Sequence, residues 1–481
     1  MNTLRGSRAH PLHQWLTVLG LGMSVGLLAI WLQRLESKWM ILGVGAVAVV
    51  CVSAMVWDVK KVLLALIVLD IPFPLDIYFG YRRELAGMGA IVGYGVSVTT
   101  ICLAVLYGVW IVELLTKQRM LKPGFGRACL PLFSYLMFAA LSVLAARDVT
   151  FAYYELFTLA QMFLLFVYIV GNVETRAEIT FIFIFLMAGL ALESLVMHYL
   201  MATGKTFNVL SITGRVITGE GAAGAFTRVG GTMGSPIIAA TYLELLLAPA
   251  LGLALTKPAP WIRNLALVAF ALGAVALVFT YSRAAWGGFV LSLGFFCWFA
   301  WQRRLLPKIA PTLIVSSVLI LFAVFFTPIT ARIFGPDMGS AESRLPLMDL
   351  AFRMIQDHPL LGVGANNFGV AVYDYLTPEF SGDFLWAVHN KYLLVFAETG
   401  IGGFLAYILF LLVTVKRGWQ VWRKAEPALA LIGLALTAAV LGQMLHMFVD
   451  VFHGRPQVQL LWLVAALISS MHLQLGRKNE S

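Results

Sequence analysis

The chain has 481 residues, of which 60% are hydrophobic and only 12% are charged, and its mean hydropathy is +0.87. Soluble domains carry about 25% charged residues, so this composition excludes a soluble globular protein. The formal net charge of +10 is best explained by basic loops between membrane spans, so we expect no nucleic-acid partner.

Apolar runs of at least about eighteen residues, each long enough to cross a bilayer, recur along the whole chain. We therefore expect an all-α polytopic integral membrane protein with about 12 to 14 transmembrane helices, forming a single membrane domain over residues 1–481. The first run lacks a small-residue cleavage site and should be retained as a span. The predicted spans centre near Val25, Ala48, Ile67, Thr99, Met137, Leu164, Phe185, Leu246, Ala271, Leu293, Val318, Leu405, Ala438 and Ala465.

Basic residues are distributed unevenly among the predicted loops. If the N-terminus is cytoplasmic, about 20 of the 34 lysines and arginines fall in inside segments, in agreement with the positive-inside rule. We therefore expect a multi-pass protein of the bacterial inner membrane with both termini in the cytoplasm. The polar segments 202–232 and 327–388 then face the periplasm.

Two long polar segments interrupt the apolar runs. Segment 202–232 is rich in glycine and small residues, which make a poor helix, so we expect irregular backbone that leads into the next span at Ser235. Segment 327–388 is the large periplasmic loop. Within it, residues 344–356 have apolar positions at helical spacing and predict an amphipathic helix that lies on the membrane or caps a cavity. Residues 358–369, rich in Gly and Asn, predict a turn.

Arg283, in the sequence TYSRAAWGG, stands between two apolar runs that are separated by almost no loop. It should lie at or just inside the outer membrane surface, where a guanidinium faces a cavity or a partner anion. A diphosphate is a suitable partner, because the planar guanidinium binds phosphate oxygens in pairs. We place the neighbouring Tyr281 in the same site. The alternative is an ordinary arginine at a tight hairpin whose side chain extends to the membrane surface.

Two arginines of segment 202–232 compete for the role of second phosphate ligand. Arg228 is favoured, because RVGGTMGSP places it on the flexible approach to a span, and Arg215 is the other candidate. Either can equally be a plain loop charge. Three further polar residues of the large loop are candidates for lining the substrate site: Arg344, Asn366 and Asn367.

The segment WAVHNKYLLVFAETGIGG, residues 386–403, places His389 and Asn390 at the mouth of an apolar helix. An imidazole can accept a proton near neutral pH, so His389 is the candidate general base for an acceptor hydroxyl. Asn390 would orient His389 or hydrogen-bond a sugar. The alternative for His389 is a histidine that only caps the helix. Glu398, deeper in the same helix, is a membrane-buried carboxylate for which helix pairing and a functional role are equally supported.

His446, Asp450 and His453 recur at a spacing that places all three on one helix face. Two imidazoles and a carboxylate can bind a metal. We rank this interpretation below a hydrogen-bonded cluster that lines a cavity, and both below an inert interface cluster. No metal and no other cofactor is therefore predicted. Asp70 and Asp76, with prolines between them, are explained by a broken span that ends at the surface.

Over about residues 213–403 the chain resembles the superfamily of O-antigen ligases and polymerases. The resemblance is carried by Arg228 with GGTMGSP, Tyr281-Ser282-Arg283, Arg344, HPLLGVGANNF and HNKYLLVFAETGIGG. It implies a polytopic inner-membrane glycosyltransferase that takes a glycan from undecaprenyl diphosphate and needs neither a nucleotide sugar nor a metal. Ile237 follows Pro236 where many members have Pro-Asn, so an amide contact of the family is missing here.

The family's catalytic residues map onto Arg283, onto Arg228 or Arg215, and onto His389. The resemblance implies that the arginines bind the diphosphate and that the histidine deprotonates an acceptor hydroxyl for direct, inverting displacement at the anomeric carbon. The favoured acceptor is the lipid A core oligosaccharide, as in a ligase. A polymerase would use another lipid-linked repeat, and a third type of member uses a protein. The alternative from a different class is a lipid-linked glycan transporter, which needs a cavity that reaches both membrane faces and no essential base.

Overall fold

The computed structural model describes residues 58–83, 89–117, 121–209, 212–221, 224–306, 323–334, 344–376 and 387–477, with isolated positions between 309 and 320. The predicted spans near Val25 and Ala48 lie outside the described residues, and the span near Val318 lies mostly outside them. The chain divides into two compact units, Met1–Leu64 with Val209–Ser211, and Ala65–Asn208 with Ile212–Ser481. In the first unit the structure describes the start of helix α3 (Val59–Leu69) and Val209. The architecture below is that of the second unit.

Ten helices in the described part of the chain are long and apolar enough to cross a membrane. They coincide with the predicted spans from Thr99 onward, except the one near Val318, and confirm a mostly helical, multi-pass membrane protein. The span predicted near Ile67 is not among them, because α3 ends at Leu69, before Pro72, and has only 11 described residues. The ten helices are α4 (Val98–Leu115), α5 (Phe125–Leu141, continued by a 3-10 turn over Ser142–Ala145), α6 (Val149–Asn172), α7 (Arg176–Thr203), α8 (Pro236–Leu255), α9 (Pro260–Phe279), α10 (Arg283–Gln302), α15 (Lys391–Lys424), α16 (Pro427–His446) and α17 (Arg455–Arg477).

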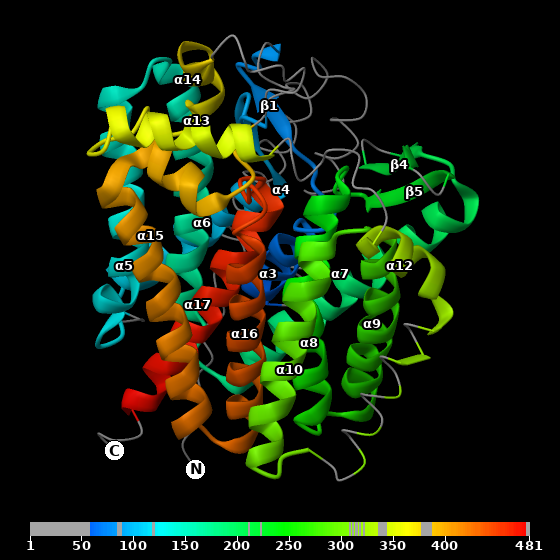
Figure 1. The fold of residues 1–481 in the computed structure, drawn as a ribbon. Helices are drawn as coiled ribbons and strands as arrows, with labels where there is room; N and C mark the ends of the chain where they lie inside the picture. Colours follow the sequence, from blue (N-terminus) through cyan, green and yellow to red (C-terminus); the bar gives the residue numbers. More distant parts are fainter. Residues whose placement is uncertain are drawn as a thin grey trace, which may run out of the picture. The chain divides into compact units, whose positions relative to one another are not determined.

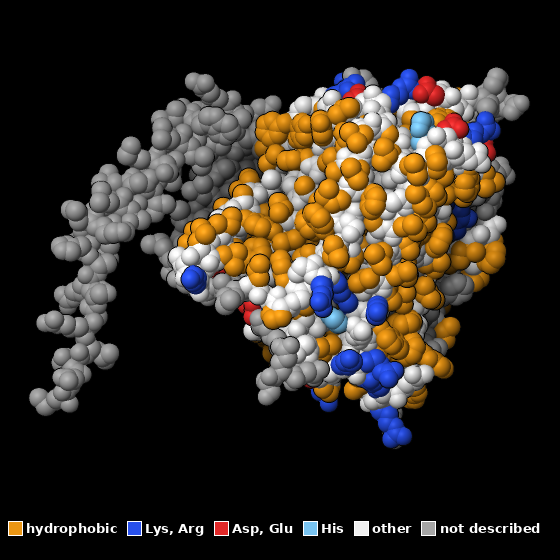
Figure 2. Space-filling view, turned by 90° about the vertical axis from the view of Figure 1, so that its left-hand side faces the viewer, with side chains coloured by type: hydrophobic (Ala, Val, Ile, Leu, Met, Phe, Trp, Pro, Cys, Tyr) orange, Lys and Arg blue, Asp and Glu red, His pale blue; other side chains and the backbone are white. Residues whose placement is uncertain are grey.

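Hydrophobic side chains cover a broad region of the face drawn in Figure 2, and lysines and arginines gather beyond it toward the lower end. Large apolar side chains such as Val112 on α4, Trp298 on α10 and Leu405 on α15 are exposed. Apolar exposure on this scale is costly in water and favourable against lipid tails. The surface therefore agrees with the helix lengths in indicating a membrane-spanning protein.

The sequence sets the helix starts through ordinary capping chemistry. Asp148 accepts a hydrogen bond from the Thr150 N–H at 3.0 Å and caps α6. Thr175 and Glu178 form a reciprocal capping box at the start of α7. Helices α8, α9 and α16 each begin with proline, whose fixed φ suits the first turn and whose missing N–H is not needed there.

Helix α16 packs against α8, α10 and α15 (Figure 1). Its contact with α10 is close, because a Cβ atom placed on Gly442 would lie 2.5 Å from the carbonyl oxygen of Gly288. Glycine at both positions lets the two backbones approach, as is common between helices in a membrane. This contact brings the end of α16 beside the start of α10, where Arg283 is located.

Segment 202–232 contains a β-sheet, not the irregular backbone that we expected. Strands β3 (Phe207–Val209), β4 (Ile212–Gly221) and β5 (Gly224–Gly231) form the sheet in that order, with β4 and β5 antiparallel (Figure 1). The prediction was wrong because it weighed the glycines alone, although β-branched residues such as Val216 and Thr227 lie among them and favour strands. The register pairs Ile217 with Arg228, so Arg228 is held on a strand.

The amphipathic helix predicted at 344–356 is confirmed as α13 (Arg344–Asp357). Its apolar face buries Leu347, Leu350 and Met354 in a cluster with Phe151 of α6. In Figure 1, α13 crosses the ends of the membrane helices, and α14 (Phe368–Tyr375) lies beside it. This helix therefore covers the bundle and a cavity at that end. Two smaller elements, α12 (Phe326–Phe334) and a two-stranded sheet of β1 (Ile77–Phe79) and β2 (Tyr94–Val96), complete the described fold.

Helix α15 is broken at Gly400, which has φ 66° and ψ −172°. The predicted turn after α13 packs into this break. The Val363 N–H donates to the Ala397 carbonyl at 2.8 Å, and the Ile401 N–H donates to the Pro359 carbonyl at 2.8 Å. These bonds satisfy backbone groups that a break would otherwise leave unpaired inside the protein. The break joins the large loop to the helix that follows His389.

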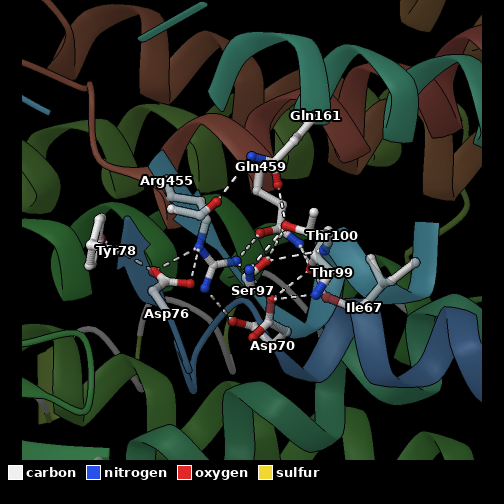
Figure 3. Close-up of polar contacts among 11 residues, drawn as sticks. Ile67, Asp70, Asp76, Tyr78, Ser97, Thr99, Thr100, Gln161, Arg455 and Gln459 are labelled. Atoms are coloured by element: carbon white, nitrogen blue, oxygen red, sulfur yellow. Dashed lines mark hydrogen bonds and ion pairs between the residues drawn. The ribbon is translucent and has the colours of Figure 1, made fainter. Parts of the chain in front are cut away.

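Figure 3 shows Arg455 in a polar network that joins the start of α17 to the end of α3 and to β1. Its Nη1 donates to Asp70 Oδ2 at 2.8 Å and to Gln459 Oε1 at 2.6 Å, and its Nε lies 3.0 Å from Asp76 Oδ1. Asp70 and Asp76 are therefore members of a buried ion network, and the surface position that we expected is wrong for Asp70, which is 4% exposed. The network fixes the start of α17, directly after the segment that joins it to α16.

Candidate functional site

Four arginines, two histidines and one aspartate line a single cleft with about 1020 Å³ of empty space, part of it open to solvent. They come from six segments between Arg228 and Asp450. Five residues proposed from the sequence lie in this cleft: Arg228, Tyr281, Arg283, Arg344 and His389. The remaining lining consists of Ile237, Ser282, Ala284, Arg332, Leu347, His446, Val449 and Asp450.

Arg228 is held in the cleft by a bond of its own side chain and by the anchoring of its strand. Its Nε donates to the carbonyl oxygen of Thr280, at the end of α9, at 2.9 Å. Directly after β5, the Thr232 N–H donates to Glu193 Oε1 of α7 at 2.9 Å, which anchors the hairpin to the bundle. Burial, together with the charge of the nearby Arg332, lowers the pKa of Arg228 to about 10. The guanidinium therefore still carries its charge at neutral pH.

The turn before α10 presents Arg283 to the cleft. Tyr281 has φ 51°, in the left-handed region, and Ser282 caps the helix by accepting from the Ala285 N–H at 3.4 Å. Arg283 is the first residue of α10, so its charge lies beside the positive end of the helix dipole. Arg332 of α12 is positioned by the same turn, because its Nε donates to the Tyr281 carbonyl at 3.2 Å.

Arg332 was not proposed from the sequence. The signal for it was TPITARIF, residues 327–334, where a basic residue follows an apolar run in the large loop. Such a charge is ordinary in a loop, and only the fold shows that it shares a cleft with Arg228 and Arg283.

His389 lies beside a carboxylate from another part of the chain. Its Nδ1 is 3.6 Å from Asp450 Oδ1, and the two side chains are only 14% and 8% exposed. This separation is slightly longer than a hydrogen bond, so the contact is a close electrostatic one that a small side-chain movement would convert into a bond. Burial alone would raise the pKa of Asp450, and the adjacent His389 and His446 lower it below its ordinary range. Asp450 is therefore a carboxylate at neutral pH.

His446 and Asp450 form part of the cleft wall, so the inert interface cluster that we ranked first is wrong for these two residues. The helix breaks after His446, and the next segment returns Asp450 toward it, with 3.5 Å between His446 Nε2 and Asp450 Oδ2. His453 lies apart from them and lines two smaller cavities, one of which also contains Lys391. The helical spacing in the sequence grouped the three residues. It did not show that His446 and Asp450 line the cleft and that His453 does not.

Asn366 and Asn367 were expected to line the substrate site, but they are buried and do not line the cleft. Asn366 Nδ2 donates to the carbonyls of Ile91 and Phe151 at 2.7 and 2.9 Å. Asn367 Oδ1 accepts from the Asp148 N–H at 2.8 Å. Their amides are thus used to tie the turn after α13 to the start of α6, which explains the Asn pair in structural terms.

Three other residues proposed for substrate binding also lie away from the cleft lining. Asn390 caps α15 by accepting from the N–H groups of Tyr392 and Leu393, both at 3.0 Å. Glu398 is buried, accepts from the Phe368 N–H at 3.1 Å, and lines a smaller cavity. Arg215 is exposed on β4, beside the irregularity between Arg215 and Val216.

Two kinds of chemistry follow from the cleft. Four guanidinium groups and a helix N-terminus form a site for an anion with several oxygens, such as a phosphate ester or diphosphate. The same cleft contains the His389 imidazole beside the Asp450 carboxylate, which is the arrangement of a general base. The arginines are suited to an anionic leaving group, and the imidazole is suited to a hydroxyl nucleophile.

Ten apolar helices in the described part of the chain define a multi-pass membrane protein, and four arginines line its cleft. Residues 268–408 match the O-antigen ligase family domain, which confirms the resemblance found in the sequence. This domain indicates a glycan-transferring ligase or polymerase and lipid-linked glycan substrates. It contains Arg283, Arg332, Arg344 and His389, whereas Arg228 precedes it, and His446 and Asp450 follow it. Comparison with curated proteins gives no match.

Proposed function

We propose that this protein transfers a glycan from undecaprenyl diphosphate to an acceptor sugar hydroxyl at the periplasmic face of the bacterial inner membrane, as an O-antigen ligase with lipid A core oligosaccharide as acceptor. The observation that carries the proposal is the single cleft in which Arg228, Arg283 and His389 meet. These three residues come from different segments, and each was proposed from the sequence for its own chemistry.

The arginines bind the donor and stabilise its leaving group. Arg228 and Arg283 hold the diphosphate oxygens, with Arg332 and Arg344 on the same cleft supplying further positive charge. As the bond between the anomeric carbon and the phosphate oxygen breaks, its electron pair moves to the diphosphate. Preorganised cations at that position lower the barrier, because they stabilise charge that develops only in the transition state. The proposed step therefore requires no metal.

His389 accepts the proton of the acceptor hydroxyl as that oxygen attacks the anomeric carbon. Attack opposite to the departing diphosphate inverts the anomeric configuration. Asp450 beside Nδ1 favours the tautomer with a proton on Nδ1, which leaves Nε2 to accept the proton from the acceptor. The same carboxylate stabilises the imidazolium that results.

The donor site is common to ligases and polymerases, so a polymerase that extends lipid-linked repeats is the main alternative outcome. A lipid-linked glycan transporter would need no base in its cleft, and the pairing of His389 with Asp450 favours an enzyme over a transporter.

The test is a reaction of the purified full-length protein with undecaprenyl-diphosphate-linked repeats, with and without lipid A core, resolved on a gel. Product that appears only with the core supports the ligase. A ladder of longer lipid-linked glycans without the core shows a polymerase. No product in either reaction, from folded protein and intact donor, overturns glycan transfer.

A further inference from the structure

His446 of the cleft wall forms a buried acid–base pair with a residue that does not line the cleft. Glu244 of α8 and His446 at the end of α16 both have side chains with 0% exposure, and Glu244 Oε2 lies 2.6 Å from His446 Nδ1. Gln443 Nε2 donates to the same oxygen at 3.1 Å. No role in the proposed reaction has been given to Glu244, although a buried carboxylate is costly and is held in place by specific partners.

The helix packing leaves room for this carboxylate. A Cβ atom placed on Gly288 of α10 would lie 1.9 Å from Glu244 Oε1, so any larger residue at position 288 would displace the Glu244 side chain. The close contact of Gly288 with Gly442, described above, brings α10 and α16 together around it. The carboxylate therefore occupies a space that the three helices α8, α10 and α16 enclose.

Asp450 lies between this pair and His389, the proposed base. His446 Nε2 lies 3.5 Å from Asp450 Oδ2, and Asp450 Oδ1 lies 3.6 Å from His389 Nδ1. The Val451 N–H donates to Asp450 Oδ1 at 2.8 Å and fixes the carboxylate from the backbone. Four titratable groups therefore lie in a row, in the order Glu244, His446, Asp450 and His389. A nitrogen faces an oxygen at each contact.

Each of these contacts requires a proton, because an unprotonated nitrogen and a carboxylate oxygen would bring two lone pairs together. His446 lies between two carboxylates, so both of its nitrogens need a proton or take part in sharing one. Glu244 supports this state by placing an anion on the side of His446 that faces away from the cleft. Asp450 then receives a proton donor on the His446 side and keeps its other oxygen for His389.

We propose that Glu244 and His446 are positioning residues that hold Asp450 toward His389, so that His389 keeps its proton on Nδ1 and presents Nε2 to the acceptor hydroxyl. This inference rests on the proposed role of His389 as general base. Loss of the Glu244 charge leaves His446 neutral, and the full negative charge of Asp450 then acts on His389. The imidazolium form of His389 becomes more favourable, and the base is protonated at a higher pH.

When Glu244 is changed to the neutral isostere Gln, the other charged side chains near the four titratable groups are not altered. Those that face these groups from neighbouring segments of the described structure are Arg228, Arg283, Arg332 and Arg344 around the cleft, and His453 with Lys391 beyond Asp450. A difference between the wild type and Glu244→Gln therefore reports the Glu244 charge.

The experiment is a pH titration of full-length, ¹⁵N-histidine-labelled protein in lipid nanodiscs, with the His389 signal assigned by its loss in His389→Gln. We expect wild-type His389 to be protonated on Nδ1 when neutral and to titrate at a higher pH in Glu244→Gln. Transfer by this variant should fall about tenfold more at pH 6 than at pH 8. Glu398→Gln, which replaces a buried acidic side chain that is not one of the four groups, should leave the His389 titration unchanged.

A neutral His389 with its proton on Nε2, or an identical titration in wild type and Glu244→Gln, would overturn the inference. If Glu244→Gln does not fold, His446→Gln replaces it, since the amide keeps a donor toward Asp450 but removes the titrating group, and the same shift is expected. The His389 titration can be measured without turnover. If the titration is as expected but the wild-type protein transfers no glycan, the result counts against the proposed function alone.

Discussion

The Nε of Arg228 donates a 2.9 Å hydrogen bond to the backbone carbonyl of Thr280, just before the turn that presents Arg283. A strand from the hairpin and the start of α10 are thereby locked together, and each contributes one arginine to the cleft. The spacing of the two guanidinium groups is set by this bond and is less dependent on the flexibility of either segment alone.

Substitution of Arg228 by Lys should reduce transfer by about tenfold or more, because the ammonium keeps the charge but cannot bond Thr280 and bind phosphate oxygens in pairs. The measurement is the initial rate of transfer at limiting donor. Arg215→Lys is the matched control from the same hairpin, and we expect its rate to stay within about twofold of wild type, since Arg215 does not line the cleft. The opposite pattern would assign the phosphate ligand to Arg215.

Arg283→Ala and His389→Ala should each reduce transfer by at least about 100-fold, the scale expected when a general base or a cation that stabilises the leaving group is removed. Both side chains are at the cleft surface, so expression and thermal unfolding in detergent should be close to wild type. Near-normal product from either well-folded variant would refute that residue's assigned role.

Gly400→Ala should destabilise the protein by at least about 2 kcal/mol, measured by unfolding in detergent. The residue has φ 66°, and a Cβ atom there would lie 2.1 Å from the carbonyl oxygen of Leu360. Gly294→Ala is the control, because a Cβ atom at this position of α10 meets no heavy atom within 4 Å. Equal stability of the two variants would show that the break in α15 accommodates a side chain at position 400 without strain.

We expect the protein to lose stability in mild acid because of His453. Burial lowers its pKa from the ordinary 6.5 to about 4, with the Lys391 charge acting in the same direction. Between these values the unfolded chain binds a proton that the folded protein does not, so stability falls as the pH drops from 6.5 to 4 and this contribution is constant below 4. The loss is at most about 3 kcal/mol.

His453→Gln removes that titration and should lose less stability than wild type between pH 7 and pH 4.5, as measured by unfolding midpoints in one detergent. Parallel curves for the two proteins would assign the acid sensitivity to other groups.

The membrane helices and five of the residues that line the cleft were predictable because each depends on a local signal. An apolar run such as that around Ala271 is long enough to define a span, and Arg283 stands out because a charge is costly between two apolar runs. Pairings between distant segments leave no comparable signal. Asn366 was predicted to line the substrate site, but its amide donates to the carbonyls of Ile91 and Phe151. Arg332 was not proposed, because only the fold brings α12 beside Tyr281.

The hairpin and the acidic partner of His389 show the same limit. Glycines in segment 202–232 concealed strand-forming residues such as Val216, whose partners lie across the hairpin. Asp450 was recognised only as a neighbour of His446, because nothing in the sequence links it to His389.

The cleft also determines when the protein can become active during its synthesis. Arg228 is made before the O-antigen ligase domain of residues 268–408, and Asp450 is made after it. A nascent chain that has completed the domain still lacks the carboxylate beside His389, and it acquires it only when α16 has been inserted and the chain has turned back. Fragments that contain the domain alone should therefore be inert, and two separately expressed pieces divided in the connection between α15 and α16 offer a direct way to restore the site by co-assembly.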